Sequence, residues 1–135
     1  MSSDAQKSAS NVIKYYNASG ANLPQETYVL DHASLQGGTV IDKDGIDDGD
    51  IGMINIVYTR VFQPLHAQLN ADILSQALPI ETPVYVSDPL LVPASDIHVT
   101  PLAGDYFIGK LWESQGTDVG IRVQLLPPIP YSEMT

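Results

Sequence analysis

The most informative stretch of the sequence lies near its C-terminal end. An apolar residue stands at every second position from Val119 to Leu125, and Gly or a polar residue fills the positions between them. Because successive side chains of a strand point to opposite faces of a sheet, this period of two predicts a β-strand with one buried face. Residues 105–112 form a second apolar run, and residues 114–117 between the two runs predict a turn. Together they predict an antiparallel β-hairpin.

Short β-branched and aromatic runs begin at residue 27 and are separated by Gly, Pro, Asn or Asp, as strands are separated by turns. Regular short strands with this punctuation favour a sandwich or small barrel over βαβ units. We therefore expect an all-β fold, a single antiparallel β-sandwich or small β-barrel domain with an extended N-terminal arm and at most one short helix. The expected strands are residues 27–30, 39–41, 51–62, 83–87, 97–100, 105–112 and 119–126.

Residues 65–78 fit both periods. Leu65, Leu69 and Ile73 recur at helical spacing, yet apolar residues also alternate from residue 65 to residue 73. Ala, Gln, Asn and Asp form strands poorly, and Pro64 suits the first turn of a helix. These observations favour one short helix, although helix and strand both stay open at this point.

The two ends of the chain differ in composition from its middle. Residues 1–26 are rich in Ser, Ala, Asn and Gln, and their only apolar cluster is too small to nucleate a core. They predict an arm that only a neighbour could order, and removal of residues 1–20 should leave the rest folded. Residues 27–126 are the expected β-rich domain, with one core. Residues 127–135 predict an extended proline-rich tail, because prolines lack the N–H groups that a sheet needs.

Charge and composition exclude several classes of partner. The chain has 6 Lys and Arg against 16 Asp and Glu, a net charge of −10, which repels nucleic acid and anionic membranes alike. No cysteine is present to form a disulfide or a thiolate metal site. The polar start and the lack of a long apolar run predict a protein that is made and kept in a cytosol. The glycosylation sequon at Asn17 is interpreted as chance.

Motifs of catalysis are missing from the sequence. His32, His66 and His98 lie far apart, and each is expected on the surface or in a loop. No Gly-x-Ser-x-Gly elbow, phosphate-binding loop or cysteine nucleophile occurs. We therefore predict no catalytic residue, no cofactor and no enzymatic activity. A small β-sandwich hydrolase stays as an alternative on fold analogy alone.

Residues 42–50 form an acidic turn that could surround a hard cation such as Ca²⁺. The spacing departs from that of an EF-hand loop, because Ile46 replaces an oxygen ligand and no Glu stands at the twelfth position. The two Asp-Gly pairs are turn dipeptides in their own right. A solvated turn without metal is therefore predicted, and the weak candidate ligands are Asp42, Asp44, Asp47, Asp48 and Asp50.

Three segments in the second half of the chain carry a family resemblance. They are residues 79–88 (PIETPVYVSD), 107–114 (FIGKLWES) and 118–125 (DVGIRVQL), and together with the residues between them they span about a third of the chain. In this order they resemble the end of small tailed-phage head decoration (cement) proteins, with a V-Y strand, an I-G strand and a final V-x-V-x-L strand. The chain departs from that pattern in its long polar arm and in Glu81-Thr82-Pro83, where the family has Gly-Asp.

The resemblance implies a non-enzymatic β protein on the outer surface of a bacteriophage capsid. It implies homotrimers that bind the major capsid protein and bridge its subunits, with neither nucleic acid nor membrane as a partner. The expected partner-binding residues lie in the arm and the tail: Val12, Ile13, Tyr15, Tyr16, Ile129 and Tyr131.

Two other functions fit the same sequence. One is another minor phage structural protein. The second is a carbohydrate-binding or host-recognition β module, which needs exposed aromatic side chains. Trp112 lies on an expected strand, where we predict that it is buried in the core.

Overall fold

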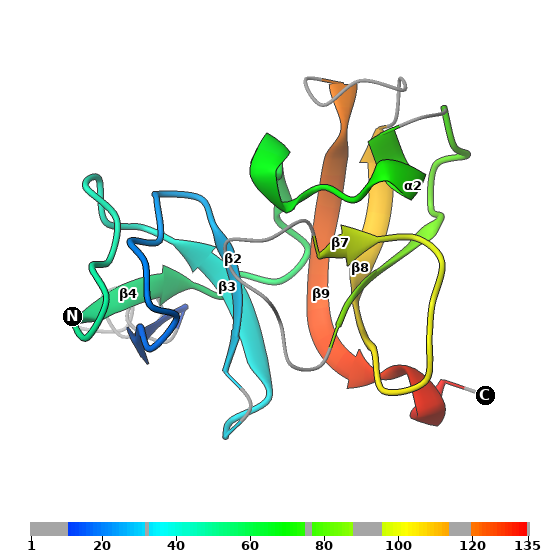
Figure 1. The fold of residues 1–135 in the computed structure, drawn as a ribbon. Coiled ribbons are helices and arrows are strands. Elements are labelled where there is room, and N and C mark those ends of the chain that lie inside the picture. Colours follow the sequence, from blue (N-terminus) through cyan, green and yellow to red (C-terminus); the bar gives the residue numbers. More distant parts are fainter. Residues whose placement is uncertain (1–10, 32, 75–76, 88–95, 114–119, 135) are drawn as a thin grey trace, which may run out of the picture.

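The computed structural model describes residues 11–31, 33–74, 77–87, 96–113 and 120–134. These residues form two antiparallel sheets that lie beside each other (Figure 1), so the predicted all-β fold is confirmed. The first sheet has the order β1-β4-β3-β2, and the second has the order β5-β9-β8-β6-β7. The strands are β1 Val12–Tyr16, β2 Tyr28–Asp31, β3 Gln36–Val40, β4 Ile51–Asn55, β5 Val61–Phe62, β6 Pro83–Val86, β7 Ile97–His98, β8 Tyr106–Glu113 and β9 Arg122–Pro130.

The segment that fitted both periods forms helical turns. The 3₁₀ turn η1 spans His66–Gln68, and the four-residue helix α2 spans Ala71–Leu74. Between them Leu69 is extended and bridges β7 at Ile97, and this pairing interrupts the helix. A further 3₁₀ turn, η3, spans Tyr131–Glu133. None of the helices in the described residues is long and apolar enough to cross a membrane.

The predicted hairpin of β8 and β9 is confirmed as an antiparallel pair. The alternating residues Ile121, Val123 and Leu125 are fully buried, which places one face of β9 in the main hydrophobic cluster. Val119 and the expected turn at residues 114–117 lie outside the described residues.

The apolar interior divides into two clusters, not the single core expected from the sequence. One cluster lies on the second sheet and includes Tyr28 and Leu30, while the other lies on the first sheet and includes Val29. Strand β2 causes this division, because successive side chains of one strand point in opposite directions and both faces of β2 are buried. Tyr58 packs against both clusters.

The N-terminal segment is part of the β fold from residue 12 onward, so its description as a coreless arm is wrong there. Strand β1 pairs antiparallel with β4 along its whole length, and Leu23 is fully buried in the cluster of the first sheet. Pairing with β4 satisfies backbone groups that a free arm would leave in water, and Ile13 and Tyr15 add apolar contacts.

The prolines of the expected tail do not stop the sheet. Strand β9 continues to Pro130, with Ile129 opposite Phe107. The register shifts between Gly109 and Phe107, so that three residues of β9 lie opposite a single residue of β8. The shift places Pro127 and Pro128 in an irregularity where the ladder is interrupted, which is one of the positions that a sheet allows proline.

Candidate functional site

The strongest candidate for an interaction site is the outer face of strands β1 and β4. Cross-strand pairing places Tyr16 opposite Ile51 and Lys14 opposite Met53. Tyr16 is 57% exposed and Ile51 is 65% exposed, an unusual degree for two large apolar side chains that lie side by side. We call these four residues the β1–β4 outer face.

The backbone of β1 is also accessible, because β1 is an edge strand. Asn17 N donates to Asp50 O, and Ile56 N donates to Asn11 O, so the backbone groups of Asn11 and Asn17 that form these bonds point toward β4. By the same alternation Val12, Lys14 and Tyr16 direct their N–H and C=O groups away from β4. Within the described residues no strand pairs with this side of β1.

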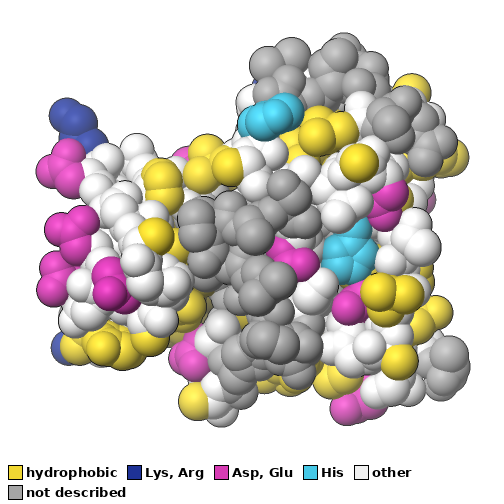
Figure 2. All heavy atoms as spheres, viewed as in Figure 1, with side chains coloured by type: hydrophobic (Ala, Val, Ile, Leu, Met, Phe, Trp, Pro, Cys, Tyr) yellow, Lys and Arg dark blue, Asp and Glu magenta, His cyan; other side chains and the backbone are white. Residues whose placement is uncertain are grey.

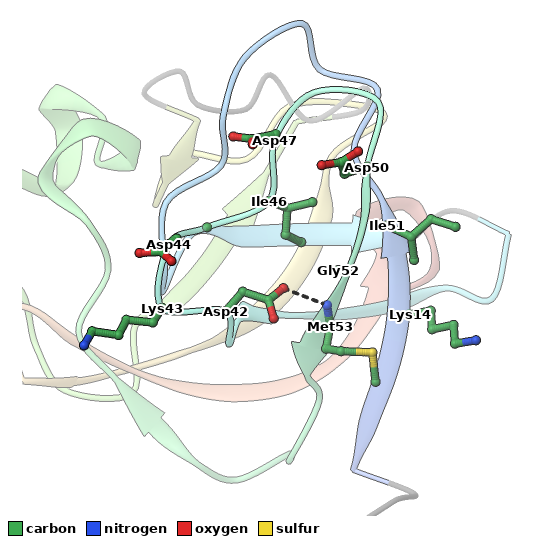
Figure 3. A pocket seen from close by; sticks show the side chains of 11 residues that line it. Lys14, Asp42, Lys43, Asp44, Ile46, Asp47, Asp50, Ile51, Gly52 and Met53 are labelled. Atoms are coloured by element: carbon green, nitrogen blue, oxygen red, sulfur yellow. Dashed lines mark hydrogen bonds between the residues drawn. The ribbon is translucent and has the colours of Figure 1, made fainter.

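A shallow hollow of about 570 Å³ adjoins the outer face. Figure 3 shows Lys14 and Ile51 on one side of it and the acidic turn on the other. Four carboxylates line it, which are those of Asp42, Asp44, Asp47 and Asp50. Acidic side chains also gather at this end of the molecule in the space-filling view (Figure 2). Two lysines, Lys14 and Lys43, line it as well. The border of the apolar pair therefore carries more acidic than basic groups.

Three carboxylates of the acidic turn accept hydrogen bonds from backbone or side-chain groups of the same chain. Asp42 Oδ2 accepts a hydrogen bond from Met53 N at 3.1 Å. Asp48 Oδ1 accepts one from Gly20 N at 2.9 Å, and Asp47 Oδ1 accepts one from the Asn22 amide at 2.7 Å. Asp47 and Asp48 thus connect the acidic turn to the loop at residues 17–22, whereas Asp42 connects it to β4.

The glycines of the turn have the role that the sequence predicted. Gly45 and Gly49 adopt φ angles of 79° and 85°, which favour glycine. A Cβ atom on Gly45 would also lie 2.4 Å from the Leu23 carbonyl oxygen. No group of three His, Cys, Asp or Glu side chains with metal-binding geometry occurs within the part of the chain that the structure describes.

The sequon asparagine is a structural residue. Asn17 is fully buried, and its amide nitrogen donates to Ala21 O at 2.8 Å and to Ile46 O at 2.7 Å. Its side-chain oxygen accepts a hydrogen bond from Ser19 N. The nitrogen that glycosylation would modify is therefore used inside the fold.

The four partner-binding residues expected in the arm fall on opposite faces of β1. Ile13 and Tyr15 pack against the inner cluster of the first sheet, and burial raises the pKa of Tyr15, with a smaller contribution from the charge of Asp31. Val12 and Tyr16 lie on the opposite face, where Tyr16 meets Ile51. Sequence reasoning missed Ile51 and Met53 as site residues, although their alternation with Gly52 and Ile54 was a usable signal.

The two expected tail residues lie on the second sheet, away from β1. Ile129 is 39% exposed and pairs with Phe107 in the ladder of β8 and β9. Tyr131 packs edge-on against Tyr85, with ring centroids 5.4 Å apart. Its backbone N–H donates to Asp105 O. Tyr131 therefore makes contacts within its own chain, and the structure does not bring the tail residues to the β1–β4 outer face.

His98 is buried on β7, so its expected place on the surface or in a loop is wrong. Its Nδ1 lies 2.7 Å from Asp96 O, and its Nε2 lies 2.7 Å from Asp105 Oδ2. The same carboxylate oxygen accepts a hydrogen bond from Leu102 N. Both ring nitrogens are occupied, which leaves neither to act as a base toward a substrate. His66 is exposed on η1, and His32 lies outside the described residues.

Trp112 is 57% exposed, so the prediction that it is buried is wrong. Its neighbour Leu111 takes the inward position on β8 and is 1% exposed. The two adjacent apolar residues of a strand must point to opposite faces, and the sequence does not say which of them points inward.

Comparisons of the chain with protein-family models, with curated proteins and with solved structures gave no match.

Proposed function

We propose that this chain is a non-enzymatic head decoration protein, which binds the outer surface of a bacteriophage capsid and bridges major capsid protein subunits. The observation that carries the proposal is the exposed pair of Tyr16, on the edge strand β1, and Ile51, on the neighbouring strand β4. Large apolar side chains at the centre of a contact provide most of the binding energy in protein interfaces. The resemblance of residues 79–125 to decoration proteins supplies the class of partner.

The charges around the outer face favour a basic protein surface as the partner. Four Asp and two Lys side chains line the adjoining hollow, so acidic groups are in excess there, and the whole chain carries a net charge of −10. Border charges of this kind steer association and reject partners of the same sign. Packaged nucleic acid is repelled, whereas the outside of a protein shell is accessible to an acidic protein.

Assembly in many copies fits a contact of this size. A single Tyr–Ile pair with its border provides modest affinity, and repeated copies on one shell strengthen attachment by effective concentration. Homotrimers are part of the proposal, because symmetric association is one way in which proteins cover exposed sheet edges.

The proposal is tested by co-sedimentation of the purified chain with phage heads. We expect the protein to sediment with expanded heads and not with unexpanded ones, because a bridging site requires subunits in their final positions. The variant Ile51→Ser should lose at least ten-fold in affinity, which corresponds to about 1.4 kcal/mol. Leu102→Ser is the matched control, since Leu102 is 66% exposed and Ile51 is 65% exposed.

Two results would contradict the proposal. One is a wild-type chain that sediments with neither form of head. The other is an equal loss of binding in Ile51→Ser and Leu102→Ser, which would place the contact away from the β1–β4 outer face.

A further inference from the structure

A second hollow lies on the other sheet, at the end of β8 that carries Trp112. Its volume is about 160 Å³. Two of its lining residues are large, apolar and exposed, with Trp112 at 57% and Ile80 at 68%. We call it the Trp112 hollow, and its lining residues are Ile80, Glu81, Lys110, Leu111, Trp112 and Gln124.

Residues of strands β8 and β9 form one side of this hollow. Lys110 and Trp112 are two residues apart on β8 and so share its outer face, while Leu111 between them is buried. Gln124 of β9 lies directly opposite Lys110 in the register. The result is a platform with an indole ring beside an ammonium group and an amide.

The turn before β6 forms the other side. Glu81 has a φ angle of 69°, an unfavourable conformation for a residue with a side chain, which persists only where the surroundings hold it. Here Glu81 N donates to Leu111 O at 2.7 Å, and Leu111 N donates to Thr82 O at 2.9 Å. The Thr82 hydroxyl donates to Pro79 O. Ile80 and Glu81 are thereby fixed beside Trp112.

The polar groups of the hollow offer hydrogen bonds of both kinds. The Glu81 carboxylate can accept and the Lys110 ammonium can donate. The Gln124 amide can do either, and its Nε2 also donates a long hydrogen bond of 3.4 Å to Thr59 O. Within the described residues neither Glu81 nor Lys110 forms a side-chain ion pair or hydrogen bond. The hollow therefore combines one apolar aromatic wall with a rim of available donors and acceptors.

We propose that the Trp112 hollow binds a neutral sugar ring. One face of such a ring consists of C–H groups, which pack on the negative face of an indole, while its edge carries hydroxyl groups that donate and accept. A purely apolar partner would remove Glu81 and Lys110 from water without giving them hydrogen bonds, at a cost in binding free energy. Glu81 and Lys110 carry opposite charges, so the hollow has no net charge from its lining and attracts neither an anion nor a cation as a whole.

This site is separate from the surface proposed for head binding. The Trp112 hollow belongs to the second sheet, whereas the β1–β4 outer face belongs to the first. A molecule attached through β1 and β4 could therefore keep the hollow open to solvent. Its ligand, a saccharide, differs in class from a capsid subunit, and either proposal can fail without the other.

Intrinsic fluorescence tests the site directly, because Trp112 is the only tryptophan in the chain. The full-length protein is titrated with cellohexaose, laminarihexaose, mannohexaose and chitohexaose, each to about 10 mM, above the millimolar Kd of a weak single-ring site. At least one of these probes should give a saturable blue shift and at least a two-fold reduction in acrylamide quenching.

Variants then assign the binding by calorimetry, which does not depend on the indole signal. Trp112→Ala should lower the affinity at least ten-fold, and Trp112→Phe should recover part of that loss, since a phenyl ring can still stack. Gln124→Ala should weaken binding several-fold. Tyr16→Ala is the matched control, because Tyr16 is an aromatic residue with the same 57% exposure on the other sheet, and its affinity should equal that of wild type.

Three results would overturn the proposal. The first is unchanged emission with all four oligosaccharides. The second is full affinity in Trp112→Ala. The third is a blue shift that follows protein concentration in the absence of sugar, which would assign the hollow to a contact between copies of the chain.

Discussion

At the scale of single residues, Tyr28 shows how far burial can dominate the behaviour of a polar side chain. Tyr28 is fully buried, and its hydroxyl lies 1.8 Å from the position that a Cβ atom on Gly37 would occupy. Gly37 therefore provides the space for this ring. No described residue forms a hydrogen bond with the Tyr28 hydroxyl. Burial, followed by the neighbouring Tyr58, raises the pKa of Tyr28 well above its ordinary value of 10.0.

This raised pKa predicts an alkaline loss of stability. The folded state keeps the Tyr28 proton, and the unfolded state loses it above pH 10, so the stabilisation is complete below pH 10 and falls as the pH rises further. Tyr28→Phe should change stability at pH 7 by no more than about 1 kcal/mol. It should also flatten the decline between pH 10 and the folded pKa. Urea unfolding at a series of pH values measures both effects, and an unchanged slope in Tyr28→Phe would contradict the argument.

At the scale of elements, strand β1 has two faces in different surroundings. Ile13 and Tyr15 pack against the inner cluster, whereas Lys14 and Tyr16 are exposed. The pairing of β1 with β4 therefore argues against the expectation that residues 1–20 can be removed without harm to the fold. Removal of β1 would uncover β4, whose Ile54 is fully buried.

Alanine substitutions along β1 should separate these faces. Ile13→Ala and Tyr15→Ala should each lower the free energy of unfolding by about 1 to 3 kcal/mol, because each removes apolar contacts from a packed cluster. Lys14→Ala and Tyr16→Ala should stay within about 0.5 kcal/mol of wild type. Chemical denaturation measures all four. Equal effects along the strand would show that β1 is not docked as described.

At the scale of the whole molecule, one buried amide joins the two sheets. Gln68 of η1 is fully buried, and its side chain bonds both backbone groups of Tyr28 on β2. Tyr28 N donates to Gln68 Oε1 at 2.7 Å, and Gln68 Nε2 donates to Tyr28 O at 2.9 Å. The Gln68 side chain thus provides the edge strand β2 with the two backbone hydrogen bonds that a neighbouring strand would otherwise provide at Tyr28.

Loss of this link should weaken the whole fold. Gln68→Leu leaves the N–H and C=O of Tyr28 buried without partners, at a cost of about 2 to 5 kcal/mol for the two groups. Gln63→Leu is the control, because Gln63 is an exposed residue of the same connection. Thermal unfolding followed by Trp112 fluorescence and by far-UV circular dichroism should show a lower midpoint in Gln68→Leu alone. An unchanged midpoint would mean that the amide does not couple the sheets.

The candidate sites were only partly predictable from the sequence. The sequence led to the prediction that Tyr16 binds a partner, and the structure shows that Tyr16 is exposed, but Ile51 and the exposure of Trp112 emerged only from the structure. The alternation of apolar and polar residues along a strand divides its residues into two sets, but it does not say which set faces inward. That choice depends on what packs against the strand, which is decided by residues far away in the chain.

The sequence by itself determined the β class, the hairpin of β8 and β9, and the turn role of Gly45 and Gly49, because each follows from a local period or a local backbone preference. Only the tertiary structure decided the rest. Pro127 and Pro128 join β9 because of the register of β8, and His98 is buried because Asp96 and Asp105 provide acceptors for both ring nitrogens. These outcomes depend on contacts made after the elements pack together, and no local pattern records them.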